Sequence, residues 1–252
     1  MINMKLISKK SEELCKDHYL LKIKADDIIS SPGQFVNIKI SEMTDPLLRR
    51  PFSIHNHENG IIEIVFRVVG KGTKILRELE RPEAVDVIGP FGRGFSPIKN
   101  GSALLIGGGV GNAPLFYLAK KLKANGNKVV YLYGSKSKDL VFLHDKFQSA
   151  SDEFILATDD GSLGKKGMIT EYARELLNNS SFDHVYSCGP DVMQKTVVQL
   201  MKGKASPVEV SLEKNFGCGF GVCYGCSLET EDGIKRTCVD GPVFDGRIIR
   251  WQ

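Results

Sequence analysis

Continuous apolar runs alternate with amphipathic segments along the middle of the chain. Strands are predicted for residues 102–107, 128–133, 154–158 and 184–187. Helices are predicted for residues 113–124, 169–178 and 191–202. Unbroken apolar strands are typical of parallel sheets buried on both faces, and their alternation with helices is typical of doubly wound folds. Residues 100–205 are therefore expected to form an α/β domain.

The first hundred residues show a different pattern, in which short β-rich runs are separated by turn residues. Strands are predicted for residues 19–24, 34–40, 61–69 and 84–89, with turns at 31–33 and 56–60. One helix is predicted for residues 73–80. Many short strands with few helices favour an antiparallel β-barrel over residues 1–99. The fold class is thus mixed β and α/β, with a third, small unit over residues 206–252.

Composition narrows the class of protein. Of the 252 residues, 42% are hydrophobic and 25% are charged, which is ordinary for a globular protein. The net charge of +4 is too small to predict binding to nucleic acid or to an anionic membrane. Apolar stretches such as residues 103–106 are far shorter than the ~20 residues of a membrane span, and the first residues carry no apolar signal segment. We expect a cytoplasmic protein with neither kind of partner.

The cysteines carry the strongest chemical signal. Four of the six fall in the pattern Cys218-x4-Cys223-x2-Cys226, followed after eleven residues by Cys238. This is the plant-type spacing for a 2Fe–2S cluster, and four glycines between residues 216 and 226 let a loop wrap around such a cluster. A zinc site and unliganded thiols are the alternatives. Cys15 stands alone and is expected to be a small packed side chain.

Glycine-rich turns follow two of the predicted parallel strands. Gly107, Gly108, Gly109 and Gly111 lie between a strand and a helix whose first turn holds a proline, so exposed N–H groups can meet a dinucleotide pyrophosphate. A tight turn without a ligand is the alternative. Cys188, Gly189 and Pro190 follow a later strand, at the edge where open α/β sheets bind ligands. The turn at 158–162 can line the same cleft or be an ordinary Asx turn.

In the first domain, residues 49–54 read Arg-Arg-Pro-Phe-Ser-Ile and are expected to precede a strand. An arginine there supplies a fixed positive charge for a phosphate. The alternative is a basic turn that binds no ligand. Residues 67–73 form a second glycine-rich loop that opens a helix, and this loop is another candidate anion site. His55 and His57 flank a turn, whereas His18, His144 and His184 are expected to be surface or packing residues.

The order of these motifs resembles the ferredoxin–NADP reductase superfamily. Within it, the cysteine loop makes the chain similar to the electron-transfer subunits of bacterial NAD-dependent (type B) dihydroorotate dehydrogenases. The resemblance runs from about residue 6 to residue 250 and is carried by the stretches 50–54, 66–73, 88–95 and 238–244. It implies an FAD-binding β-barrel domain, an NAD-binding α/β domain and a 2Fe–2S cluster domain, in that order.

The resemblance also assigns residues to cofactors. FAD would contact Arg50, Pro51, Phe52, Ser53, Val65, Phe66, Arg67, Gly72 and Thr73. NAD(H) would lie over residues 107–111, with Cys188, Gly189 and Pro190 near the nicotinamide. Cys218, Cys223, Cys226 and Cys238 would ligate the cluster. The implied partner is an FMN-containing catalytic subunit in a heterotetramer of two plus two chains; neither an orotate site nor a catalytic acid or base is expected in this chain.

One stretch departs from the family's pattern. Where the family is expected to read Ile-Gly-Val-Pro-Pro, residues 110–114 read Val-Gly-Asn-Ala-Pro. Lys136 and Lys138, after the second parallel strand, could meet the 2′-phosphate of NADP, but loop lysines are commonly just solvated, so NAD is expected. Two other functions stay open: a related reductase subunit of the NADH–ferredoxin:NADP oxidoreductase or sulfide dehydrogenase type, and a redox or zinc sensor that binds nucleotide without turnover.

Overall fold

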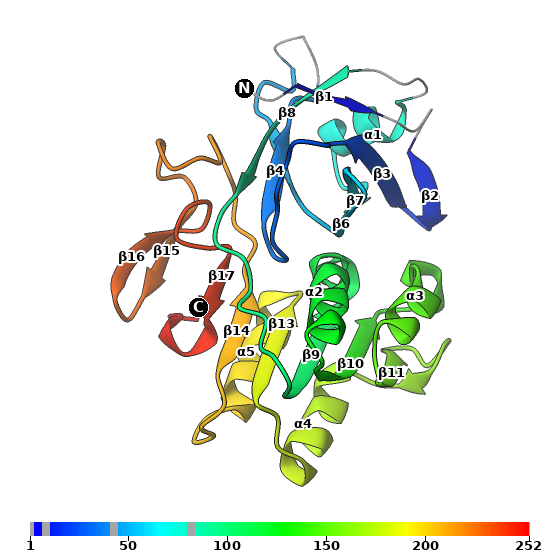
Figure 1. The fold of residues 1–252 in the computed structure, drawn as a ribbon, viewed down its shortest axis with the longest axis vertical. Coiled ribbons are helices and arrows are strands. Elements are labelled where there is room, and N and C mark those ends of the chain that lie inside the picture. Colours follow the sequence, from blue (N-terminus) through cyan, green and yellow to red (C-terminus); the bar gives the residue numbers. More distant parts are fainter. Residues whose placement is uncertain (1–2, 7–10, 41–44, 80–83, 252) are drawn as a thin grey trace.

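The computed structural model describes residues 3–6, 11–40, 45–79 and 84–251. A β-barrel lies above a seven-stranded sheet that is covered by helices, and the C-terminal segment lies beside both (Figure 1). Among the described residues, no helix is long and apolar enough to cross a membrane.

The barrel is built from eight antiparallel strands. Its strands are β1 (Asn3–Leu6), β2 (Glu12–Cys15), β3 (His18–Lys24), β4 (Phe35–Ile38), β5 (Arg50–Ser53), β6 (Asn56–Glu58), β7 (Ile61–Arg67) and β8 (Ala84–Phe91). They follow the order β5-β4-β8-β1-β3-β7-β6, with β2 beside β3, and β5 packs against β7 across the barrel. The antiparallel barrel predicted from the sequence is therefore confirmed.

Several barrel elements differ from their predicted positions. The segment around Arg50 was expected to precede a strand, but it is itself the strand β5, because it pairs with β4 along its whole length. The strands β1 and β2 were not predicted, and the predicted turn at 56–60 is wrong over its first three residues, which form β6 because they pair with β7. The helix predicted for residues 73–80 is α1 (Lys71–Arg77), and Glu80 lies outside the described residues.

The second sheet forms the centre of the α/β domain. It contains β9 (Ser102–Gly108), β10 (Lys128–Ser135), β11 (Glu153–Thr158), β12 (Lys165–Lys166), β13 (His184–Cys188), β14 (Val208–Ser211) and β17 (Val243–Asp245). All neighbours are parallel except the last pair. The helices α2 (Asn112–Ala124) and α3 (His144–Ser149) pack on one face, while α4 (Ile169–Asn179) and α5 (Asp191–Leu200) pack on the other. This is the predicted doubly wound arrangement.

The chain reverses its winding direction beside β9. From β9 it proceeds through β10 to β11 and β12, and it then crosses to the other side of β9 to form β13. The loops that follow β9 and β13 therefore leave neighbouring strands in opposite directions and open a crevice. Open α/β sheets bind their ligands at such a point, beyond the carboxyl ends of the strands.

The C-terminal segment contributes to the α/β sheet as well as forming a small unit of its own. The strands β15 (Ser227–Thr230) and β16 (Gly233–Arg236) form a separate hairpin. The strands β14 and β17, however, extend the seven-stranded sheet, so this sheet crosses the boundary predicted between residues 205 and 206. The division into 1–99, 100–205 and 206–252 stays a prediction.

The helix α2 joins the barrel to the α/β domain. The Tyr117 hydroxyl donates a hydrogen bond to the carbonyl oxygen of Ser30 in the barrel, at 3.0 Å. Nδ1 of His55, between β5 and β6, lies 2.8 Å from the carbonyl oxygen of Ala113. Lys120 pairs with Glu58 of β6, at 2.7 Å. These contacts fix the barrel relative to the first turns of the helix that follows the glycine loop.

Candidate functional site

Two motifs predicted to bind FAD lie together in the barrel. A methyl group on Gly72, at the start of α1, would lie only 3.1 Å from Nε of Arg50 in β5. The guanidinium group of Arg50 therefore covers the glycine-rich loop, although twenty-two residues separate the two in the chain. Arg49 instead points to Asp86, with a nitrogen–oxygen distance of 2.6 Å. Of the two arginines, Arg50 is the one placed to meet a ligand at this loop.

The remaining residues of β5 are half-buried, as expected for a strand that lines a binding site. Phe52 packs edge-on against Phe66 of β7, with ring centroids 5.7 Å apart. At the loop, the Thr73 hydroxyl accepts hydrogen bonds from the N–H groups of Val69 and Gly70, at 3.0 and 3.2 Å. Thr73 thus holds the loop in its bent shape.

At two of the positions in β7 that are predicted to contact FAD, only the backbone is available to a ligand. Val65 and Phe66 are 4% and 2% exposed, so their side chains belong to the core, whereas Arg67 is exposed. One edge of β7 pairs with β3 throughout. On the other edge, β6 pairs only as far as Glu63, and no other described strand pairs with the residues beyond it. A nucleotide can hydrogen-bond to this open edge.

The two loops predicted to bind NAD(H) meet at the point where the sheet reverses direction. A methyl group on Gly111 would lie 2.6 Å from the carbonyl oxygen of Cys188 and equally close to the backbone of Gly189. Gly109 has a positive φ of 55° and open space around its Cα, so the loop is accessible there. Glycine is needed at 111 for close approach and at 109 for its backbone conformation. The structure thus brings the two loops into contact, and their role in binding NAD(H) stays a prediction.

Cys188 is half-buried at the end of β13, and its carbonyl oxygen lies next to Gly111. Burial raises the pKa of its thiol to about 12, although a hydrogen bond from Ser211 opposes the shift. The thiol is therefore neutral at physiological pH and is not an activated nucleophile. It can line the site as a small, polarisable side chain.

The four clustered cysteines are free thiols arranged as two pairs. The sulfur atoms of Cys226 and Cys238 lie 3.2 Å apart in a buried position. Cys218 and Cys223 form the second pair, because each sulfur accepts a hydrogen bond from the backbone N–H of the other residue, at 3.4 and 3.3 Å. Within the described ranges, no three His, Cys, Asp or Glu side chains converge as they would around a single ion. Two thiol pairs suit a two-iron cluster, in which each iron takes two cysteine ligands.

At Cys218 the loop favours the thiolate form that iron requires, whereas burial raises the pKa of Cys238. Burial raises the pKa of Cys218, but backbone N–H groups of Phe220, Cys223 and Val222 outweigh this effect and lower its pKa to about 6. The N–H of Gly225 donates similarly to the Cys223 sulfur, at 3.4 Å. Hydrogen bonds to cysteine sulfurs stabilise negative charge there and tune an iron–sulfur centre.

The cysteine loop packs directly on the barrel. Cys226 and Cys238 form a small core with Phe35 of β4. The ring of Phe35 also contacts that of Phe216, with centroids 5.1 Å apart. In the strand ladder Phe35 stands opposite Ser53 of β5. Phe35 thus contacts the Cys226–Cys238 pair through its ring and pairs through its backbone with β5, the strand predicted to contact FAD.

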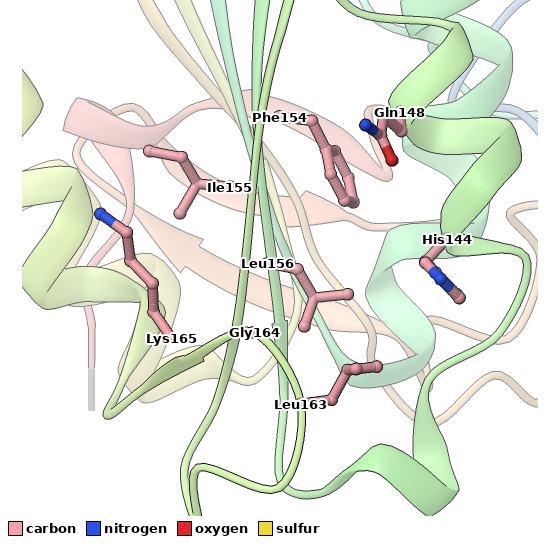
Figure 2. A pocket seen from close by; sticks show the side chains of 8 residues that line it. All are labelled: His144, Gln148, Phe154, Ile155, Leu156, Leu163, Gly164 and Lys165. Carbon is pink, nitrogen blue, oxygen red and sulfur yellow. The ribbon is translucent and has the colours of Figure 1, made fainter.

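Other surfaces of the α/β domain are less closely tied to these residues. Asp160 caps the turn that follows β11, accepting hydrogen bonds from the N–H and hydroxyl of Ser162, so the Asx turn considered for this segment is present. Lys136 and Lys138 are exposed. Figure 2 shows a pocket between α3 and β11, which contains none of the residues predicted to bind a cofactor. Its lining consists of His144, Gln148, Phe154, Ile155, Leu156, Leu163, Gly164 and Lys165.

A flavin-type barrel, a nucleotide crevice in a doubly wound sheet and a cysteine loop define a class: an oxidoreductase of ferredoxin reductase-like fold with an iron–sulfur domain. Comparisons with known families agree. An oxidoreductase FAD-binding domain matches residues 4–95, and an oxidoreductase NAD-binding domain matches residues 105–199. The iron-sulfur cluster binding domain of dihydroorotate dehydrogenase B matches residues 213–250.

Curated relatives identify the family. The chain is 39% identical over 243 residues to the dihydroorotate dehydrogenase B (NAD(+)) electron transfer subunit of Fusobacterium nucleatum, covering 92% of each chain. It is 41% identical to that of Bacillus pumilus, covering 93% of each, and 39% identical to that of Geobacillus thermodenitrificans, covering 97% of this chain and 94% of the relative. The chain belongs to this family of electron transfer subunits. It is an oxidoreductase subunit with FAD-, NAD- and iron–sulfur-binding domains, as predicted.

Solved structures show the same architecture. One, from a study of flavin-based electron bifurcation by an NADH-dependent reduced ferredoxin–NADP oxidoreductase, has a TM-score of 0.88 and 32% identity. The match covers 100% of this chain and 91% of that chain. A ferredoxin reductase of carbazole 1,9a-dioxygenase has a TM-score of 0.68 at 23% identity, covering 83% of this chain and 68% of that chain. The second likeness concerns the fold alone.

Proposed function

We propose that this chain carries electrons from a dihydroorotate-oxidising partner subunit to NAD, as part of pyrimidine biosynthesis. The names of relatives about 40% identical over most of the chain support this role and the use of NAD rather than NADP. The proposed partner is an FMN-containing catalytic subunit, in a heterotetramer of two plus two chains. The complex would work in the cytoplasm, where free cysteines such as these persist unoxidised.

Each cofactor is proposed to occupy the residues assigned to it by the motifs. FAD would lie against β5, the open edge of β7 and the loop before α1, with Arg50 neutralising phosphate charge. NAD(H) would enter the crevice between Gly109 and Cys188. The cluster would be held by the pairs Cys218–Cys223 and Cys226–Cys238. When bound, flavin supplies the conversion between two-electron hydride chemistry and one-electron transfer.

The observation that carries the proposal is the position of Phe35. Its backbone pairs with the predicted FAD strand opposite Ser53, and its ring packs against Cys226 and Cys238. Asn37, two residues along the same strand, donates a hydrogen bond to the carbonyl oxygen of Gly219 in the cysteine loop, at 3.4 Å. The strand β4 thus contacts both the proposed flavin strand and the cysteine loop, which supports a short electron path between them.

The residues of this chain would act by positioning the two cofactors. The contacts between α2 and the barrel fix the glycine loop relative to β5, and so would orient the nicotinamide toward the flavin. The thiol of Cys188 stays neutral because burial raises its pKa, so it would not compete as a nucleophile beside the nicotinamide. No proton transfer by a side chain is needed for hydride transfer itself.

An anaerobic absorption titration tests the proposal. The full chain, with FAD and cluster bound, is titrated with NADH and then mixed with the FMN-containing subunit and orotate. We expect NADH to bleach the flavin and cluster bands, and orotate to restore them only when the partner is present. A colourless protein, prepared so that cluster loss is excluded, would contradict the reductase assignment and favour the sensor alternative.

A second candidate function has one specific observation in its favour. The bifurcating ferredoxin–NADP oxidoreductase structure matches the whole of this chain, at a TM-score of 0.88. A subunit of a related reductase would show the same bleaching by NADH. It would give no response to orotate with the dihydroorotate-oxidising partner, and this arm of the titration separates the two functions.

A further inference from the structure

Asn112 lies where the glycine loop meets the helix that follows it. It directly follows the glycine loop and is the first residue of α2. Its side chain is 0% exposed. A buried primary amide is costly unless its donors and acceptor are satisfied, so its hydrogen bonds show what it holds together.

The amide of Asn112 joins the glycine loop to the neighbouring strand. Its Nδ2 donates hydrogen bonds to the carbonyl oxygens of Gly109, at 2.9 Å, and Gly134, at 3.3 Å. Its Oδ1 accepts a hydrogen bond from the hydroxyl of Tyr131, at 3.2 Å. Gly134 and Tyr131 both belong to β10, and Tyr131 is fully buried. The amide therefore bridges the carboxyl ends of β9 and β10.

The surrounding backbone leaves the amide little freedom. A methyl group on Gly107 would overlap the Oδ1 atom of Asn112, so the strand before the loop is shaped around this side chain. On the far side of the loop, Gly111 abuts the backbone of Cys188 and Gly189. The loop is thus held between Asn112 on one side and the Cys188 turn on the other, while Gly109 stays accessible.

We propose that Asn112 is a positioning residue for the dinucleotide: its amide holds the glycine loop in the shape that receives the pyrophosphate. The inference rests on the proposed placement of NAD(H) over this loop. Asn112 is buried beneath the loop and acts through Gly109, so its loss should weaken dinucleotide binding and leave hydride transfer from bound NADH unaffected. Preorganised loops gain affinity because they lose less freedom on binding.

The chain supplies a matched control in Asn127. This asparagine is 3% exposed, and its Nδ2 donates to the carbonyl oxygens of Ile98 and Leu122, at 2.7 and 2.8 Å. Its Oδ1 accepts from the N–H of Gly101, at 2.8 Å. It therefore forms the same three-bond arrangement at the opposite, amino end of β9 and β10. Asn127→Val removes an equivalent buried amide far from the glycine loop.

The test compares the two variants by anaerobic stopped-flow reduction of the full chain with FAD and cluster bound. The NADH concentration dependence gives a Kd and a limiting rate of flavin bleaching. We expect Asn112→Val to raise the Kd for NADH about tenfold, because the loss of one hydrogen bond that orders the loop has an effect of about this size. Its limiting rate, FAD content and iron content should match those of the wild type. Asn127→Val should lower the melting temperature without changing the Kd.

Two results would overturn the inference. One is an unchanged Kd in Asn112→Val; the other is an equal rise in Asn127→Val, which would mean that general destabilisation is the cause. If Asn112→Val does not fold, Tyr131→Phe decides, because it removes only the hydroxyl that bonds to Oδ1. A raised Kd in that variant supports the inference and an unchanged Kd refutes it. Wild-type protein that NADH does not bleach would instead refute the proposed function, and the inference with it.

Discussion

His55 shows how one side chain can join two domains and be constrained by both. It follows the predicted FAD strand, is 0% exposed, and stacks on Phe116 of α2 with ring centroids 4.7 Å apart. Because a carbonyl oxygen only accepts, Nδ1 must donate the hydrogen bond to Ala113. Nε2 is buried without a partner in the described structure. The ring is therefore held as one neutral tautomer.

Protonation of His55 should destabilise the fold in a defined pH window. Burial lowers its pKa from 6.5 to about 4, a shift that the bond to Ala113 only partly opposes. Above pH 6.5 neither the folded nor the unfolded state binds the proton. Between pH 6.5 and 4 only the unfolded state binds it, so stability falls as pH falls, by about 1.4 kcal/mol per pH unit. Below pH 4 the dependence ends.

The measurement is the melting temperature of the full chain at pH 7.5 and at pH 5.5. His55→Phe keeps the stacking surface and lacks the titrating group, so it should lose less stability than the wild type over this interval. His144→Phe, at a half-exposed position, should behave like the wild type. Equal losses in the wild type and in His55→Phe would contradict the argument, because the other histidines are present in both.

The sequence could predict those residues whose chemical role follows from their spacing in the chain. The cysteine pattern predicted four ligands for one cluster, and the structure brings two of them, Cys226 and Cys238, within 3.2 Å of each other. It could not show the roles of Phe35, His55 or Asn112. Each acts through a contact with a residue distant in the chain, and nothing in local composition marks such a contact.

At the scale of elements, the predicted strands succeeded where several β-forming residues follow one another. The strands β9, β10, β11 and β13 match the predicted apolar runs, and β3 and β7 match predicted β-rich stretches of the barrel. By contrast, β5 and β6 are short and carry polar residues, because one side meets a ligand site or solvent. The strands β14 and β17 are separated by more than thirty residues of chain. Their pairing in the α/β sheet therefore depends on the tertiary fold and could not be predicted from the local sequence.

The strand β4 provides a prediction about electron transfer between cofactors. Phe35→Leu removes the ring between the FAD strand and the Cys226–Cys238 pair, and it should loosen the seat of the cysteine loop. We expect reduction of FAD by NADH to keep its wild-type rate, while reduction of the cluster slows. Stopped-flow absorbance at flavin and cluster wavelengths separates the two steps.

A matched control tests whether the location of the aromatic ring matters. Phe182 is 8% exposed and packs in the core on the α4 and α5 face of the sheet. Phe182→Leu should lower stability by an amount similar to Phe35→Leu, because both lose buried ring surface. It should leave both reduction steps unchanged. Slow cluster reduction in Phe182→Leu would show that global loosening is responsible.

At the scale of the whole molecule, apolar side chains gather on the surface of the cysteine loop. Val222 and Tyr224 are 71% and 58% exposed, and Phe220 and Val239 are also exposed. Exposed apolar groups around an electron-transfer loop suit a partner subunit that docks there. Because of the family to which the chain belongs, we expect the proposed catalytic subunit to dock on this surface.

Val222→Glu should disrupt this docking by burying a charge at the interface. The variant should be bleached by NADH as fast as the wild type, yet show little reoxidation when the partner and orotate are added. Ile29→Glu is the control, because Ile29 is 93% exposed on the barrel. Normal orotate-dependent reoxidation in Val222→Glu would place the docking surface elsewhere.

The extension of the α/β sheet by β14 and β17 changes how the cysteine segment should be regarded. The N–H of Leu212 donates a hydrogen bond to the carbonyl oxygen of Pro242, at 2.9 Å, so the segment 213–241 departs and returns at one place. A segment with adjacent ends can be inserted or excised at little entropic cost to its host. The cysteine segment is thus an insertion between two strands of the α/β sheet rather than an extension at the end of the domain. Truncation at residue 205 would remove β14 and β17 from the host sheet, whereas a short hairpin joining β14 to β17 would keep both strands and remove only the cysteine segment.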